Sequence, residues 1–158
     1  MIFRNNPATP LDREPEGRQV KNIDVWWGGL EGNGGLMLIL ADSLRLEDPW
    51  RGSKLTVKLV VSDESAVKGA RENLQNMITT YNITDVEYEV IEGMNRSFDE
   101  IFIESSKNAD IIFHGLPVPG KNFTASYENI SRRIENMPST VLVLAGKDSS
   151  FSEVLEKE

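Results

Sequence analysis

Residues 23–44 read "IDVWWGGLEGNGGLMLILADSL" and join three kinds of local sequence in one stretch. Residues 23–27 form a nearly continuous apolar run, which is typical of a strand that is buried on both faces. A glycine cluster follows, and glycine permits tight turns that other residues avoid. Leucine-rich sequence then continues as far as Asp48-Pro49, which predicts a helix over 34–47. The stretch therefore predicts a strand, a turn and a helix in succession.

The same succession recurs along the chain. Further strands are predicted at 54–61, 86–91, 109–115 and 140–146. Further helices are predicted at 63–80 with Ser62 as N-cap, after the capping-box pair Ser97 and Glu100, at 124–136, and after Ser150. Strict alternation predicts an α/β fold, with a parallel sheet and helices on both faces. We expect five strands in the order 3-2-1-4-5, a Rossmann-like arrangement that universal stress proteins also have.

Length and composition favour a single domain without nucleic-acid or metal chemistry. The chain has 158 residues and a net charge of −8, whereas a protein that binds nucleic acid needs a cationic surface. It has no cysteine and one histidine, so disulfides, zinc–sulfur sites and multi-histidine metal sites are excluded within one chain. Prolines among polar residues predict an extended linker or lead-in over 1–22, and we expect a single α/β domain over 23–158.

No apolar stretch is long enough to span a membrane. The most apolar segment, "GGLMLILADSL" (34–44), falls short of the roughly 18 apolar residues that a spanning helix needs. The first residues also lack the continuous apolar core of a secretory signal. We therefore expect no direct membrane insertion of this chain and a cytoplasmic location.

The predicted strand order places a crevice at the carboxyl ends of the first and fourth strands, where the direction of winding reverses. Two unusual loops meet there, the glycine-rich segment 28–35 and "LPVPGKN" (116–122). The candidate binding residues of this crevice are Gly28, Gly29, Gly34, Gly35, His114 and Gly120. We interpret the glycines as residues that permit a tight turn and close packing of a helix on the sheet. The alternative is a cradle for a nucleotide or anion.

The second loop has the spacing of a phosphate-binding P-loop but not its chemistry. Gly115, Gly120 and Lys121 match the glycines and the lysine of that motif. Two prolines between them remove backbone donors, and Asn122 occupies the place of the Ser or Thr that holds Mg²⁺. We expect no bound nucleotide and no other cofactor.

His114 ends the fourth strand without a nucleophile beside it in the sequence. We expect a hydrogen-bonded structural histidine rather than a catalytic base. Asp24 lies inside an apolar strand, where we expect it to pair with a neighbour or a helix cap, and no second carboxylate is spaced for acid–base chemistry. The sequence therefore predicts no catalytic residues, no metal site and no enzymatic activity.

Helix 34–47 is apolar nearly all round its first turns. A surface helix needs only one apolar stripe, so its second face predicts either a large central core or an interface with another subunit. The consecutive Trp26 and Trp27 point to opposite faces of a strand, which fits either explanation.

Two long segments resemble the cytosolic C-terminal domain of cation–chloride cotransporters. The first is residues 23–44 followed by "WRGSKLTVKLVV" (50–61), with a Trp-Trp strand, a Gly-Gly turn, a leucine-rich helix and a further strand. The second is "ADIIFHGLPVPGKN" (109–122) followed by "YENISRRIENMPSTVLVLAG" (127–146), similar to a later strand, a proline-rich loop and a closing helix–strand pair. The resemblance runs from about Asn22 to Leu155.

The resemblance implies a non-catalytic regulatory domain with a universal-stress-like fold. It implies a homodimer, located on the cytoplasmic side of the cell membrane, whose further partner is the protein's own transmembrane domain for ion symport. The chain has Asn33 where animal members have an acidic residue before the paired glycines, and it lacks their long insertion with phosphorylation sites, so it resembles a prokaryotic-type member. The competing hypothesis is a sensing module of universal-stress type, with a nucleotide or anion in the crevice.

Overall fold

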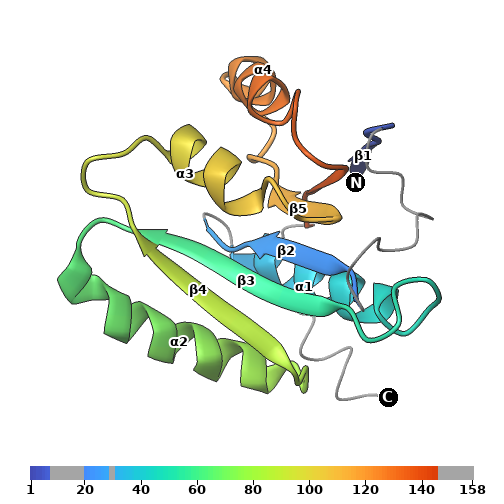
Figure 1. Ribbon diagram of the computed structural model, residues 1–158. Helices are drawn as coiled ribbons and strands as arrows, with labels where there is room; N and C mark the ends of the chain where they lie inside the picture. Colours follow the sequence, from blue (N-terminus) through green and yellow to red (C-terminus); the bar gives the residue numbers. More distant parts are fainter. Residues whose placement is uncertain (8–19, 29–30, 146–158) are drawn as a thin grey trace.

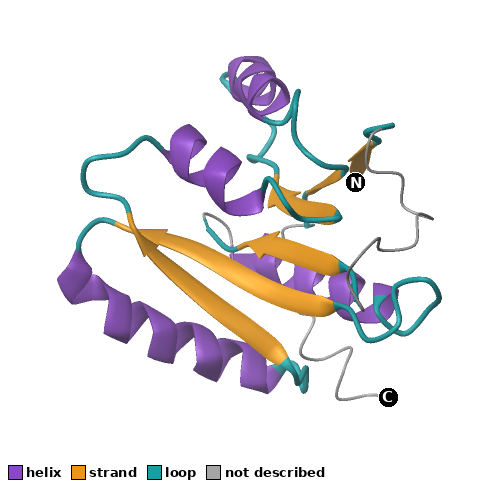
Figure 2. Ribbon diagram, viewed as in Figure 1, coloured by secondary structure: helices purple, strands orange, loops and turns teal. Residues whose placement is uncertain are grey.

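The computed structural model describes residues 1–7, 20–28 and 31–145. Six strands form one sheet (Figure 1, Figure 2). They are β1 (Ile2–Arg4), β2 (Asn22–Trp26), β3 (Lys54–Val61), β4 (Val86–Glu92), β5 (Ile111–Gly115) and β6 (Thr140–Val143). Their order in the sheet is β1-β6-β5-β2-β3-β4, with β1 antiparallel to β6 and the other neighbours parallel. The chain is therefore an α/β protein with a mostly parallel sheet, as predicted.

The prediction of five strands is wrong by one. The additional strand, β1, lies within residues 1–22, where we expected only an extended lead-in. It pairs with β6 through Ile2 opposite Leu142 and Arg4 opposite Thr140. Just beyond it, the side chain of Asn6 donates a hydrogen bond of 2.8 Å to the carbonyl oxygen of Met137. Three residues are too short to show a period of two, which is why the sequence pattern did not reveal this strand.

In the described part of the chain, four α-helices cover the two faces of the sheet. They are α1 (Glu31–Leu44), α2 (Val67–Thr80), α3 (Phe98–Ser106) and α4 (Phe123–Arg133). Figure 1 shows α1 and α2 on one face and α3 and α4 on the other. Among the residues described, no helix is both long enough and apolar enough to cross a membrane.

The helix boundaries differ from the predicted ones at starts and ends alike, and α4 ends at Arg133, three residues before the predicted end at 136. Helix α1 begins at Glu31 and ends at Leu44, three residues earlier than predicted at each end, because the glycines lie inside the helix rather than before it. Before α2, a 3₁₀ turn (Glu64–Ala66) is capped by Asp63 and not by the predicted Ser62. The predicted cap of α3 is confirmed, since the side chain of Ser97 accepts a hydrogen bond from the backbone of Glu100. The helix predicted after Ser150 lies outside the described residues.

Each face of the sheet has its own hydrophobic core. The first core lies under α1 and α2 and includes Val25, Met37 and Ile78, all fully buried. The second lies under α3 and α4 and includes Trp26 and Phe102. Trp27 packs against the first core, so the two consecutive tryptophans lie on opposite faces of the sheet, as predicted.

A buried ion pair lies in the layer of α3. The ammonium group of Lys58 on β3 lies 3.2 Å from the carboxylate of Asp24 on β2, and both side chains are less than a tenth exposed. Asp24 also accepts a 2.7 Å hydrogen bond from Ser106, whose hydroxyl accepts one of 2.9 Å from the Trp26 indole. Lys58 donates in addition to the carbonyl oxygen of Ser105 in the last turn of α3. The pair therefore holds α3 to the middle of the sheet.

Candidate functional site

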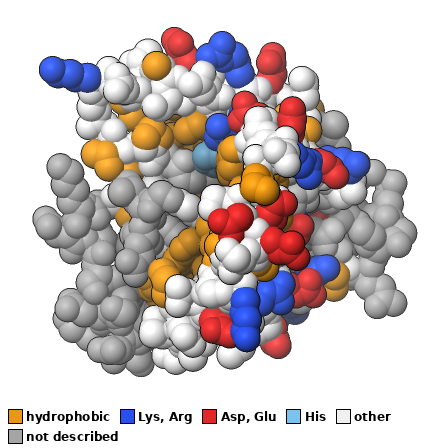
Figure 3. Space-filling model, turned by 90° about the vertical axis from the view of Figure 1, so that its left-hand side faces the viewer, with side chains coloured by type: hydrophobic (Ala, Val, Ile, Leu, Met, Phe, Trp, Pro, Cys, Tyr) orange, Lys and Arg blue, Asp and Glu red, His pale blue; other side chains and the backbone are white. Residues whose placement is uncertain are grey.

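A cavity of about 450 Å³ lies at the carboxyl ends of β2 and β5. These strands are neighbours, and the chain connections lead away from them in opposite directions, so this is the predicted crevice. Figure 3 looks onto this end of the sheet and shows the histidine beside hydrophobic side chains. The cavity is lined by Trp26, Trp27 and Gly28 at the end of β2, by Asn33 of α1, by Phe98 of α3, by residues 114–117 at the end of β5, and by Ser126, Asn129, Ile130 and Arg133 of α4.

His114 lies in the wall of the cavity and both of its ring nitrogens have partners. Nδ1 lies 2.7 Å from the carbonyl oxygen of Gly115, and Nε2 lies 3.0 Å from a guanidinium nitrogen of Arg133. A carbonyl accepts and an arginine donates, so the ring is neutral, with its proton on Nδ1. Burial lowers the pKa of His114 to about 4, and the positive charge of Arg133 acts in the same direction. A neutral imidazole with both nitrogens in hydrogen bonds supports the structural role that we predicted.

Arg133 is the principal site residue that sequence reasoning missed. Its Nε donates to the carboxylate of Asp99, and its guanidinium lies over the ring of Phe98, 4.7 Å from the ring centre. Its side chain is 17% exposed. Arg132 precedes it in the same helix and bonds to Asn129 instead. Nothing in the local sequence distinguishes the two arginines, because only the tertiary fold brings one of them beside His114.

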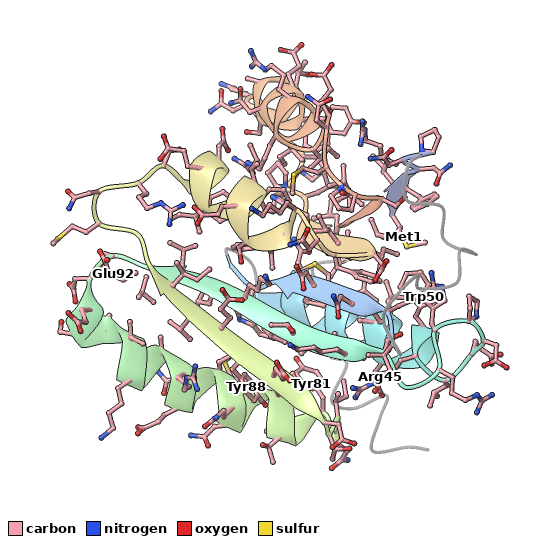
Figure 4. The ribbon with its side chains drawn as sticks, viewed as in Figure 1. Met1, Arg45, Trp50, Tyr81, Tyr88 and Glu92 are labelled. Atoms are coloured by element: carbon pink, nitrogen blue, oxygen red, sulfur yellow. The ribbon has the colours of Figure 1, made fainter. Side chains whose placement is uncertain are left out.

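The candidate glycines divide into two groups. Gly28 lines the cavity together with His114, whereas Gly34, Gly35 and Gly120 do not. A Cβ atom on Gly34 would lie 2.7 Å from the ring of Trp27. A Cβ atom on Gly35 would lie 2.6 Å from the hydroxyl of Tyr81, which follows α2 and is labelled in Figure 4. Both positions thus require a glycine for close packing, which fits the structural interpretation of this segment.

The two remaining candidates are Gly29 and Gly120. Gly29 lies outside the described residues. A Cβ atom on Gly120 would meet a single neighbour, the carbonyl oxygen of Val118 at 4.0 Å, so this glycine has ample space around it. The part of the proline-rich loop that reaches the cavity is Leu116-Pro117, at its start.

Asn33 is a second residue that the candidate set missed. It is 2% exposed, and its amide nitrogen donates a 2.9 Å hydrogen bond to the carbonyl oxygen of Leu116. Its amide oxygen accepts a 2.7 Å bond from the backbone of Ala145. One side chain therefore ties α1 to the segments that follow β5 and β6. An amide suits this position, because a carboxylate would have no hydrogen to donate to Leu116 at neutral pH.

The close packing of Gly34 leads to a first prediction. Replacing Gly34 by Ala should lower the free energy of unfolding by about 1–2 kcal/mol, because the new methyl group overlaps the Trp27 ring. Gly69 in the first turn of α2 is a matched control, because a Cβ there meets nothing within 4 Å. Gly69→Ala should raise the free energy of unfolding by about 0.5–1 kcal/mol. Urea denaturation of both variants checks the opposite signs, and equal effects would contradict the packing role of Gly34.

The chemical groups that line the cavity are few and mostly neutral. His114 has no lone pair to spare, since Nε2 already accepts from Arg133 and Nδ1 carries the proton. Ser126 lines the cavity, but the described residues place no partner base on its hydroxyl. Over the same part of the chain, no three His, Cys, Asp or Glu side chains gather as metal ligands. What the cavity offers is an apolar wall, one arginine and several neutral polar groups.

Comparison with known proteins adds no family to these observations. No protein-family model matches the chain, and no curated protein matches it. The role of the chain therefore has to be inferred from its residues and from their geometry.

Proposed function

We propose that this chain is a non-catalytic regulatory and dimerisation domain of a membrane transporter like the cation–chloride cotransporters, acting on the cytoplasmic side. The observation that carries the proposal is that the residues of the resembling motifs serve in packing. Trp26 and Trp27 pack into opposite cores, and Gly34 and Gly35 lie against aromatic rings. The segments that resemble this family thus build a rigid frame, and the described residues show no reactive pair among them.

We also propose that the fold is of the Rossmann-like, universal-stress type. The parallel strands follow one another as β4-β3-β2-β5-β6, and winding reverses between β2 and β5. Helices lie on both faces (Figure 2). The antiparallel β1 is an addition at one edge of such a sheet.

Dimerisation is supported by the outer surface of α1. Leu36, Leu40 and Leu44 are partly buried and pack on the first core, while Ile39 is partly exposed and does not belong to that core. The proposed interface would cover Ile39 together with the exposed parts of these leucines. Homo-oligomers most often use a two-fold axis, which a dimeric transporter would share with its membrane part.

The proposal predicts that Ile39→Lys weakens self-association about tenfold or more, because a buried interface does not accept an unpaired charge. Analytical ultracentrifugation from micromolar to near-millimolar concentration measures this. Ile103→Lys is the matched control, since Ile103 is 46% exposed on α3, in the opposite layer. In the complete transporter, Ile39→Lys should change ion flux while Ile103→Lys leaves it unchanged. A wild-type chain that stays monomeric throughout would contradict the dimer, and equal flux in both variants would contradict the regulatory role.

A second candidate function is that of a small-ligand sensing module. The specific observation in its favour is the cavity at the carboxyl ends of β2 and β5, the usual ligand position in a sheet of this kind. Its volume of about 450 Å³ lies in the ordinary range of small-molecule sites. The two functions are compatible, because a transporter domain that binds a ligand is also a sensor.

A further inference from the structure

We propose that the cavity at the ends of β2 and β5 binds a small organic monoanion with a flat apolar body, such as an aromatic carboxylate, and that Arg133 holds its carboxylate. The inference rests on the ligand-sensing candidate and names the class of ligand. It does not depend on the transporter assignment. Four features of the cavity support it: its walls, the free donors of Arg133, its charge, and its polar rim.

The walls of the cavity are aromatic and ordered. Trp26 is 4% exposed, and its ring contacts Phe98 edge-on at 5.5 Å between ring centres. His114 meets Phe98 in the same edge-on way, at 6.3 Å. Phe98 itself is 37% exposed, which is unusual for a large aromatic side chain packed in such a cluster. These rings offer flat apolar surface to a flat apolar ligand, and burying Phe98 under a ligand is favourable.

Arg133 keeps hydrogen-bond donors for a ligand. A guanidinium has five N–H donors. In the described structure Arg133 uses Nε toward Asp99 and Nη1 toward His114, and Nη2 has no partner there. The stacking on Phe98 and the two bonds fix the plane of the group, so little conformational entropy remains to be lost when an anion binds. The Nη1–Nη2 edge therefore presents donors in the geometry that a carboxylate accepts.

The charge of the lining favours a ligand with one negative charge. Arg133 is the only charged side chain among the described residues that line the cavity. His114 adds no second positive charge, because its ring is neutral and its Nε2 is an acceptor. A di- or triphosphate would need further cations, and Lys121 is not among the lining residues. Asp99, which is not among the lining residues, pairs with Arg133 and lowers the positive charge of the site further, so a monoanion fits this cavity better than a polyanion.

The polar rim is neutral. Ser126 and Asn129 lie on α4, two turns and one turn before Arg133, and line the same cavity. The amide oxygen of Asn129 accepts from Arg132, which leaves its amide hydrogens for other acceptors in the described structure. These groups suit hydroxyl or carbonyl substituents on a ligand and give the site a means of selecting among aromatic acids.

The test uses 1-naphthoate as the anionic probe and 1-naphthamide as its uncharged counterpart. Titration is followed by tryptophan fluorescence and by two-dimensional amide NMR of the complete chain. We expect saturable binding of naphthoate with a dissociation constant of about 1 mM or tighter, from its number of atoms. The amide should bind about tenfold to a hundredfold more weakly, because it makes no charge-assisted bond with Arg133. This comparison needs no variant, so it stands even where a substitution perturbs folding.

Arg133→Gln should weaken naphthoate binding by a similar factor while keeping a donor for His114. Arg132→Gln removes the same charge one residue earlier, from an exposed side chain, and should leave binding unchanged within about twofold. Equal binding of naphthoate and naphthamide, or equal loss in the two arginine variants, would overturn the proposal. If adenosine monophosphate binds at these residues and naphthoate does not, the ligand class is wrong and the sensing function stands. If neither probe binds, both fail, and the transporter assignment is unaffected.

Discussion

Replacing Lys58 by Met is expected to lower the free energy of unfolding by about 3–5 kcal/mol, the largest effect among our predictions. The variant keeps the volume of the side chain but leaves the carboxylate of Asp24 buried without its ion-pair partner. It also removes the 2.6 Å bond to the carbonyl oxygen of Ser105, and with it one link between α3 and the sheet. Guanidinium denaturation followed by circular dichroism measures the change.

Lys54 provides a matched control for this prediction. It lies four residues earlier on the same strand, faces the same side of the sheet and pairs with Glu87 at 3.1 Å, but both side chains are at least half exposed. Lys54→Met should therefore cost less than about 1 kcal/mol. The double variant Asp24→Asn with Lys58→Met should recover most of the lost stability, because no charge is left buried. A double variant as unstable as Lys58→Met alone would show that Asp24 is not the cause.

The pH dependence of the Lys58→Met variant follows from Asp24. Burial already raises the pKa of this carboxyl above its ordinary 3.8, and Lys58 opposes that shift. Without Lys58 the pKa rises further, so the folded variant holds the proton more tightly than the unfolded chain does. Its stability then falls as the pH rises from 3.8 through the folded-state pKa. The deficit relative to wild type should accordingly be smaller at about pH 4.5 than at about pH 7.

The second large effect is an acid destabilisation that His114 causes. Its pKa is about 4 in the folded chain, against 6.5 in an unfolded one. A base whose pKa is lowered by folding is neutral in the native state, so the unfolded state takes up the proton first. The contribution of the neutral His114 to the free energy of unfolding is therefore complete above pH 6.5 and is lost as the pH falls toward 4. The loss amounts to about 3 kcal/mol over that window.

His114→Gln separates this effect from the titration of carboxylates. Glutamine retains a donor and an acceptor but does not titrate, so the variant should be about 1 kcal/mol less stable than wild type at about pH 7.5 and more stable than wild type at about pH 4.5. The difference between wild type and variant at each pH isolates the imidazole. Because the chain has one histidine, its ring protons can also be followed by NMR without ambiguity. A ring that titrates near pH 6.5 in the folded protein would contradict the buried, neutral histidine.

The fold could be predicted largely from sequence because its signals are local. The bounds of β3, 54–61, were predicted without error, since a run of alternating and apolar residues ends at an N-cap signal. The start of α1 was misplaced because glycine is unfavourable inside helices, whereas here Gly34 and Gly35 lie within one and pack closely against Trp27 and Tyr81. The strand β1 depends on pairing with β6, which is distant in the sequence, and such pairing leaves no local pattern.

The candidate site was predicted in position but not in composition. Strand order placed it at the ends of β2 and β5, and His114 and Gly28 do line the cavity. Arg133 and Asn33 were missed because their roles come from the tertiary fold. The fold brings Arg133 of α4 beside His114, and it places Asn33 between the segments that follow β5 and β6. The glycine-rich segments predicted a site formed by backbone N–H groups, whereas the polar groups of this cavity belong mainly to side chains of α4.

The two faces of β2 meet different surroundings, and this difference fixes the register in which β2 pairs with its neighbours. Ile23 and Val25 belong to the hydrophobic core under α1 and α2, while Asp24 faces the layer that contains Lys58. A slip by one residue would exchange the faces, so that the carboxylate would lie among Met37 and Val57 without a cation. A single-residue insertion or deletion within this strand is therefore far more harmful than one in the loop around Gly120, and natural length variation should accumulate in the loop.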